Sequence, residues 1–100
     1  MSPLHTRVCD LFGVRHPIVQ TGMGWVSGAR LTAATSQAGG LGILASATMT
    51  LEQLEKAVTE VAARTDAPFG VNLRADQADI RQRIDLLVQH RVKVDRKSVV

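Results

Sequence analysis

Residues 17–28, PIVQTGMGWVSG, place an apolar stretch directly before a glycine turn and a polar residue suited to starting a helix. The β-branched residues within PIVQT, residues 17–21, favour a strand, and proline is tolerated at the first position of a strand. Gly22 and Gly24 permit a sharp turn, and the hydroxyl of Ser27 is a good helix cap. This stretch therefore predicts a strand, a turn and a helix in immediate succession.

The same alternation of strand and helix continues along the chain. Strands are predicted over residues 41–45, over residues 69–73 and from residue 92, and helices over residues 27–37, 50–65 and 76–90, with a shorter helix over residues 6–12. Thr50 and Gln53 form a capping box, and Gly39 stands where a glycine ends a helix. The helical residues expected to face inward are Leu31, Ala34, Thr35, Ala38, Leu51, Leu54, Val58, Val61, Ile80, Ile84, Leu87 and Val88.

The predicted element order is α-βαβαβαβ, which is typical of the α/β class. Strands that alternate with helices pair in parallel, and the crossovers between them are right-handed. The pattern alone does not distinguish an open, doubly wound sheet from a closed barrel. One hundred residues make one small domain or a part of a larger one.

The composition excludes several classes of partner. Only three residues are aromatic and the basic residues do not cluster, so we expect no nucleic-acid partner. No apolar run reaches membrane-spanning length and the N-terminus lacks the apolar segment of a signal peptide, so we expect no membrane partner. Cys9 is the single cysteine, which fits a reducing compartment, and we expect its side chain to pack among the apolar residues of the leading helix. These observations predict a cytoplasmic protein.

The last six residues, DRKSVV, depart from the pattern because three charged residues interrupt the fourth predicted strand. We interpret residues 1–94 as the N-terminal part of a longer domain and residues 95–100 as a non-native tail. A solvated basic C-terminus is the alternative. On the first interpretation, the strand that begins at residue 92 is cut off at residue 94 and the chain is a fragment.

The glycine turn has three competing interpretations. A dinucleotide site needs G-x-G-x-x-G, but the sixth position is Ser27, and no acidic residue ends the second strand to hold a ribose. A flat ligand could approach the two glycines closely, with the polarisable thioether of Met23 against its ring. In the third interpretation, the glycines only permit a tight connection and Met23 belongs to the core.

Three separated motifs, PIVQTGMG, AGGLG and PFGVN, resemble those of the nitronate monooxygenase (2-nitropropane dioxygenase) family over roughly residues 6–94. This resemblance implies the N-terminal half of a (βα)8 TIM barrel that binds FMN, incomplete in this chain. The sequence around QTGMGW is most similar to a branch of NAD(P)H-dependent flavin oxidoreductases, some of which act on coenzyme-A thioesters. Flavin-dependent enoyl-acyl-carrier-protein reductases share the opening motifs.

The resemblance also implies a set of cofactor-binding residues at the carboxyl ends of the first three strands: Gln20, Thr21, Gly22, Met23, Gly24, Ser46 and Asn72. Asn72 would bond the polar edge of the flavin, although a strand-ending residue satisfied by the protein is the alternative. Gln20 and Ser46 could instead bond nearby backbone. Arg74 is expected at the solvated rim, and the sequence does not decide the place of Trp25.

The activity that the resemblance implies is FMN-dependent oxidation of nitronates with oxygen. The alternatives are an NAD(P)H-dependent reductase or dehydrogenase of acyl-CoA-type thioesters and a non-catalytic truncated chain. A small molecule is the expected partner and no metal is expected. No catalytic residue is assigned, because none of His5, His16 and His90 follows a strand as a catalytic base would, and the family's histidine would lie beyond residue 100.

Overall fold

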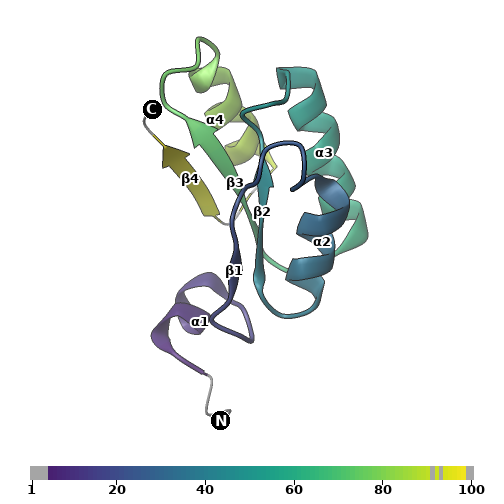
Figure 1. Ribbon diagram of the computed structural model, residues 1–100, viewed down its shortest axis with the longest axis vertical. Coiled ribbons are helices and arrows are strands. Elements are labelled where there is room, and N and C mark those ends of the chain that lie inside the picture. Colours follow the sequence, from purple (N-terminus) through teal and green to yellow (C-terminus); the bar gives the residue numbers. More distant parts are fainter. Residues whose placement is uncertain (1–4, 91, 93, 99–100) are drawn as a thin grey trace.

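The computed structural model describes residues 5–90, 92 and 94–98. In this part of the chain four parallel strands form one sheet in the order β1-β2-β3-β4 (Figure 1). The strands are β1 (Val19–Gln20), β2 (Leu41–Ala45), β3 (Phe69–Arg74) and β4 (Val94–Ser98). The helices are α1 (Arg7–Phe12), α2 (Ala29–Gln37), α3 (Leu51–Arg64) and α4 (Ile80–Gln89). The predicted order of elements and the parallel pairing are confirmed.

The helices α2, α3 and α4 form a layer against the sheet, since each packs on the next and α2 and α4 also contact strands. The helix α1 lies apart from this layer, near the start of β1 (Figure 1). The core between sheet and helices is apolar, and β2 is buried along its whole length because it lies between two strands and under α2. The core residues are Ala29, Ala33, Leu44, Leu54, Val58, Val61, Phe69, Val71, Leu73, Leu86 and Leu87.

Two local predictions about helix ends are confirmed. The hydroxyl of Thr50 accepts a hydrogen bond from the Gln53 backbone N–H, and the Gln53 side chain accepts one from the Thr50 N–H, which is the predicted capping box. Gly39 follows α2 with φ of 107°, a conformation that glycine adopts without a steric penalty. Both ends depend on contacts between residues close in sequence.

The prediction for the face of α2 is wrong. The buried residues are Ala29, Thr32, Ala33 and Ser36, whereas Leu31, Ala34 and Ala38 are exposed. The helix sits very close to the sheet: a Cβ added at Gly42 would lie 2.3 Å from the Thr32 carbonyl oxygen. Small side chains face the sheet because only they fit this separation, so hydrophobicity was a poor guide to orientation here.

The predicted start of α4 and one of its inward residues are also wrong. Residues 75–79 form the connection after β3, so the helix starts at Ile80 and not at residue 76. Leu87 is buried and Ile80 and Ile84 are partly buried, as predicted, but Val88 is 71% exposed. Arg83 and Leu86 take the inward positions.

The first and fourth strands differ in extent from their predictions. The predicted strand over residues 17–21 is reduced to Val19–Gln20. The fourth strand begins at Val94 rather than residue 92, and it runs through Ser98 in register with β3 from Gly70 to Arg74. A parallel ladder is formed by backbone groups, so charged residues do not prevent it. The origin of residues 95–100 stays a prediction, and residues 99–100 lie outside the described part.

Candidate functional site

The carboxyl ends of β1, β2 and β3 meet at one edge of the sheet, which is where ligand sites lie in parallel α/β folds. Asn72 on β3 is paired with Ala45, the last residue of β2. Gly22, two residues after β1, lies directly against them: a Cβ added to it would come 2.9 Å from the Asn72 Cβ and 3.5 Å from the Ala45 Cα. The topology therefore brings Gly22 and Asn72 into contact across 50 positions of sequence.

Ser27 holds the glycine turn in place rather than capping α2. Ser27 is 1% exposed, and its hydroxyl oxygen accepts a hydrogen bond from the Met23 N–H. The hydroxyl can donate to the carbonyl oxygen of Thr21 or of Met23, each 3.2 Å from Oγ. Its backbone carbonyl accepts a hydrogen bond from the Ala45 N–H at 3.1 Å. The N-cap of α2 is Gly28, so the predicted role of Ser27 is wrong.

The turn held by Ser27 presents two large side chains to solvent. Met23 is 42% exposed and Trp25 is 88% exposed. Trp25 has φ of 67°, a left-handed conformation that is uncommon for a bulky residue. Gly24 lies beside the loop after β2, since a Cβ added to it would be 3.3 Å from the Thr48 Cγ2. Met23 therefore does not belong to the core within the described part of the chain.

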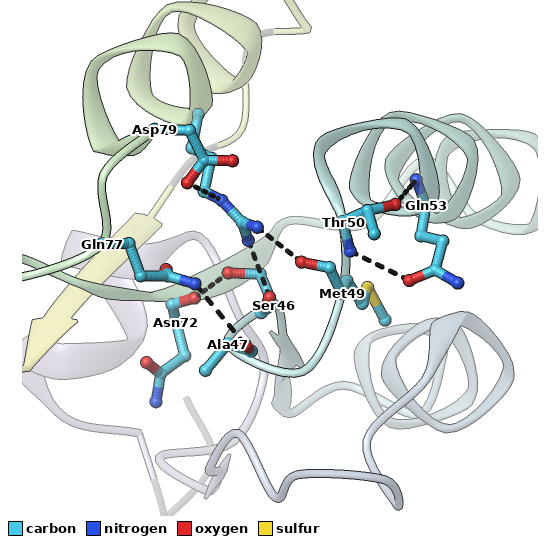
Figure 2. A network of polar contacts seen from close by, with 9 residues as sticks. Ser46, Ala47, Met49, Thr50, Gln53, Asn72, Gln77 and Asp79 are labelled. Carbon is cyan, nitrogen blue, oxygen red and sulfur yellow. Dashed lines mark hydrogen bonds and ion pairs between the residues drawn. The ribbon is translucent and has the colours of Figure 1, made fainter.

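Two side-chain amides lie at this edge with hydrogen-bonding capacity to spare. The Gln20 Nε2 donates to the Ile43 carbonyl at 3.2 Å and to the Thr21 carbonyl, while its Oε1 is buried with no partner among the described residues. The Asn72 amide points away from the neighbouring polar network (Figure 2), and no hydrogen bond joins it to another residue in the described part of the chain. Together the two amides offer donors and acceptors to a ligand.

Ser46 is engaged in the protein itself. Its side chain is fully buried and its hydroxyl donates a hydrogen bond to the Asn72 carbonyl oxygen (Figure 2). Ser46 therefore ties the end of β2 to β3, the alternative that we noted for it from the sequence. Arg74, at the end of β3, pairs with Asp76 at 2.9 Å with both side chains partly exposed, as expected for a rim residue.

Arg83 makes a long-range contact beside the candidate site that the sequence pattern did not predict. It reaches from α4 to the loop after β2, where its Nη1 donates to the Ser46 carbonyl at 2.7 Å and its Nη2 donates to the Met49 carbonyl. Its Nε donates to Asp79 at 2.9 Å. The available signal was its position, three residues after Ile80 and four before Leu87, on the inward face of the helix.

His5 and His16 lie away from the carboxyl ends of the strands. His5 pairs with Asp10 at 2.8 Å in the region of α1, and His16 lies beside Gly39 at the amino end of β2. The residues that the structure describes contain no cluster of three side chains able to hold a metal ion. None of the described helices is long and apolar enough to cross a membrane.

Comparison with known proteins agrees with this architecture. Residues 5–97 match the family model of nitronate monooxygenase. The chain is 61% identical over 94 residues to a Rhodococcus jostii protein named (3aS,4S,5R,7aS)-5-hydroxy-7a-methyl-1-oxo-octahydro-1H-indene-4-carboxyl-CoA dehydrogenase, covering 94% of this chain and 27% of that one. It is 43% identical over 76 residues to the nitronate monooxygenase of Pseudomonas aeruginosa, covering 73% of this chain and 22% of the relative.

The structure of FabK from Thermotoga maritima superposes with a TM-score of 0.88 at 39% identity, covering 93% of this chain and 30% of that one. This agreement confirms the predicted fold, the N-terminal part of a (βα)8 barrel. The chain spans about a quarter of the length of the curated relatives that it matches. By its sequence over residues 5–97 and by the arrangement of its strands, the chain belongs to the nitronate monooxygenase family.

Proposed function

We propose that the chain contributes the first part of the FMN site of an oxidoreductase whose substrate is an acyl-CoA thioester. The observation that carries the choice of substrate is the difference in identity between relatives. The dehydrogenase of a bicyclic carboxyl-CoA is 61% identical to the chain, whereas the nitronate monooxygenase of Pseudomonas aeruginosa is 43% identical. The chain is thus more similar to an enzyme named for a thioester than to one named for a nitronate.

The residues at the strand ends fit a flat, polar-edged ring such as the flavin. Gly22 lacks the Cβ that would fill the space beside Asn72, so the backbone of the turn can lie close to a ring. The buried Oε1 of Gln20 has no protein partner in the described part, and a buried acceptor without a donor is costly unless a ligand supplies one. The Asn72 amide could both donate to and accept from the ring's heteroatoms.

When bound, oxidised flavin would supply the hydride acceptor for oxidation of a substrate carbon. In this proposal the chain's own residues bind and orient. The backbone at Thr21, Gly22, Met23 and Gly24 would line one side of the ring, and Gln20 and Asn72 would hold its polar edge. Ser46 would act through Asn72, whose backbone it anchors. The group that removes the accompanying proton is not assigned to any of the described residues.

Nitronate oxidation with oxygen is the second candidate, favoured by the family model and by the relatives that carry that name. NAD(P)H as an electron donor, in place of a substrate carbon, stays a prediction. A chain with no catalytic role is the third alternative, and it is distinguished from both by the absence of bound flavin.

The test uses the complete protein that contains this chain, purified and loaded with FMN. Under anaerobic conditions it is mixed separately with a hydroindane carboxyl-CoA thioester, with propyl-2-nitronate and with NADPH, and flavin absorbance is followed by stopped flow. We expect the thioester to bleach the flavin rapidly and the nitronate to leave it oxidised. Bleaching by the nitronate alone would assign the second candidate. A protein that retains no flavin would overturn the proposal.

A further inference from the structure

We propose that Arg83 is a positioning residue of the flavin site: from α4 it sets the shape of the loop after β2, residues 46–49. The inference rests on the proposed function, since it concerns how that site is held. It gives a role to a buried cation that is not itself expected to contact the ligand.

The geometry of the guanidinium makes it a clamp between two segments. Arg83 is 3% exposed, and all three of its nitrogens contact acceptors. Two of these acceptors, the carbonyl oxygens of Ser46 and Met49, lie at the two ends of the same loop (Figure 2). A planar guanidinium with five donors holds such a set of acceptors at once, whereas an ammonium is a point charge that cannot match the fork.

The loop held by Arg83 touches both other parts of the site. Its first residue, Ser46, donates a hydrogen bond to the Asn72 carbonyl oxygen, which fixes the end of β3. Its third residue, Thr48, lies against Gly24 in the turn after β1. The Gln77 amide also donates to the Ala47 carbonyl at 3.5 Å. A shift of the loop would therefore move both the turn after β1 and Asn72 on β3, the two parts that would hold the flavin in the proposed function.

A gain in folding stability does not by itself explain why Arg83 is buried. Burying a charged group is expensive, and replacing a buried ion pair with apolar residues of similar size is often neutral or stabilising. The partner carboxylate, Asp79, is itself partly exposed, so the pair is not a closed internal one. What the cation provides that a leucine would not is a specific geometry for two loop carbonyls.

The test measures FMN affinity and the environment of the bound flavin in the complete protein. Arg83→Lys and Arg83→Gln are compared with Arg81→Gln, which removes an exposed arginine two positions away on the same helix. Dissociation constants come from flavin fluorescence titration, the ring environment from visible circular dichroism, and folding from far-ultraviolet circular dichroism. Loss of hydrogen bonds from a charged donor predicts at least about tenfold weaker FMN binding for both Arg83 variants, with a changed visible spectrum. Arg81→Gln should stay within about twofold of the parent.

The outcomes separate the inference from the proposed function. If the parent protein binds no FMN, the proposed function fails and this inference fails with it. If the parent binds FMN and folded Arg83→Lys binds it with unchanged affinity and spectrum, the positioning role is wrong even when the melting temperature falls. Should neither Arg83 variant fold, Asp79→Asn keeps the arginine and weakens only its orientation. It should then weaken FMN binding by a few-fold and shift the visible spectrum, and an unchanged affinity and spectrum would overturn the role.

Discussion

Gly42 and Gly22 show how a single missing Cβ serves packing in one place and the site in another. Gly42 lies inside β2, where glycine is normally unfavourable, and it faces the backbone of α2 at Thr32. Gly22 lies just after β1 and faces the side chain of Asn72. The contact at Gly42 is the tighter one and lies in the core, whereas the contact at Gly22 involves a candidate site residue, so substitutions at the two positions should have different consequences.

Gly42→Ala should destabilise the protein by about 1–3 kcal/mol, the usual cost of overpacking a close-packed core. The reason is that the new methyl group would lie 2.3 Å from the Thr32 carbonyl oxygen, so α2 must move away from the sheet. Thermal unfolding of the complete protein measures the effect. Gly28→Ala is the control, because a Cβ there meets nothing within 4 Å, and its cost should be limited to that of a poorer helix cap.

Gly22→Ala should weaken FMN binding as well as lower stability. The added methyl group would come within 2.9 Å of the Asn72 Cβ and 3.2 Å of its Nδ2, so the amide must rotate and the turn must also move away from β3. We expect a loss of roughly one hydrogen bond to the ligand, or about tenfold in the dissociation constant. Flavin titration beside a melting curve provides the comparison. A large fall in melting temperature with unchanged affinity would contradict this account.

Asn72→Leu tests the amide itself, since leucine is similar in size and lacks the polar head. The Asn72 backbone carbonyl, which accepts from Ser46, is left in place, so the sheet should be little affected. FMN affinity should fall by about tenfold for the lost hydrogen bond. Unchanged affinity in a folded variant would mean that Asn72 only ends its strand. Asn72→Gln is the conservative comparison, and it should retain more of the affinity.

At the scale of elements, α3 is the helix with the best-defined start. The capping box of Thr50 and Gln53 supplies two backbone groups with partners, and the helix buries Leu54, Val58 and Val61 in the apolar core. The same residue, Thr50, directly follows the loop that Arg83 holds at Met49. The start of α3 is therefore fixed from both sides, by its own cap and by α4.

Thr50→Ala should lower the free energy of unfolding by about 1 kcal/mol, the usual cost of replacing a threonine cap with alanine. Thr59→Ala on the same helix is the matched control. Its hydroxyl is exposed and donates only to the Glu55 carbonyl within the helix, so its removal should leave stability unchanged or slightly raised. Equal effects of the two substitutions in chemical denaturation would contradict the importance of the cap.

At the scale of the whole molecule, the sheet in the described part is open, with β1 at one edge and β4 at the other. The edge at β1 also carries apolar side chains, because Ile18 is 60% exposed and Val19 is 40% exposed. Unpaired edges that are apolar favour association with another chain. In the (βα)8 barrels to which the fold corresponds, closure of the sheet removes both edges.

Residues 1–100 expressed alone should therefore self-associate, as sedimentation velocity at rising concentration would show. Ile18→Lys should reduce this association because a charge on an edge strand opposes pairing. Val88→Lys is the control, since it adds the same charge at a 71% exposed position on α4, away from the β1 edge, and it should change association little. A parent chain that stays monomeric would contradict the expectation.

Features that depend on neighbours in sequence could be predicted from the sequence. Periodicity predicts the βα alternation, and that alternation implies parallel pairing of the strands. Hydrogen bonds over a few residues account for the Thr50–Gln53 cap and the glycine after α2. The resemblance of three motifs also indicated which strand ends carry the candidate site. These are properties of short segments, so the rest of the fold need not be known to derive them.

Tertiary structure decided the features that depend on distant segments. Arg83 bonds the Ser46 carbonyl across 37 positions of sequence, and α2 approaches β2 so closely that only small residues face the sheet. Ser27 holds the turn because β2 passes beside it, where its carbonyl accepts from Ala45. In each case a side chain's role is set by which backbone groups the fold brings to it, and that information is absent from local periodicity.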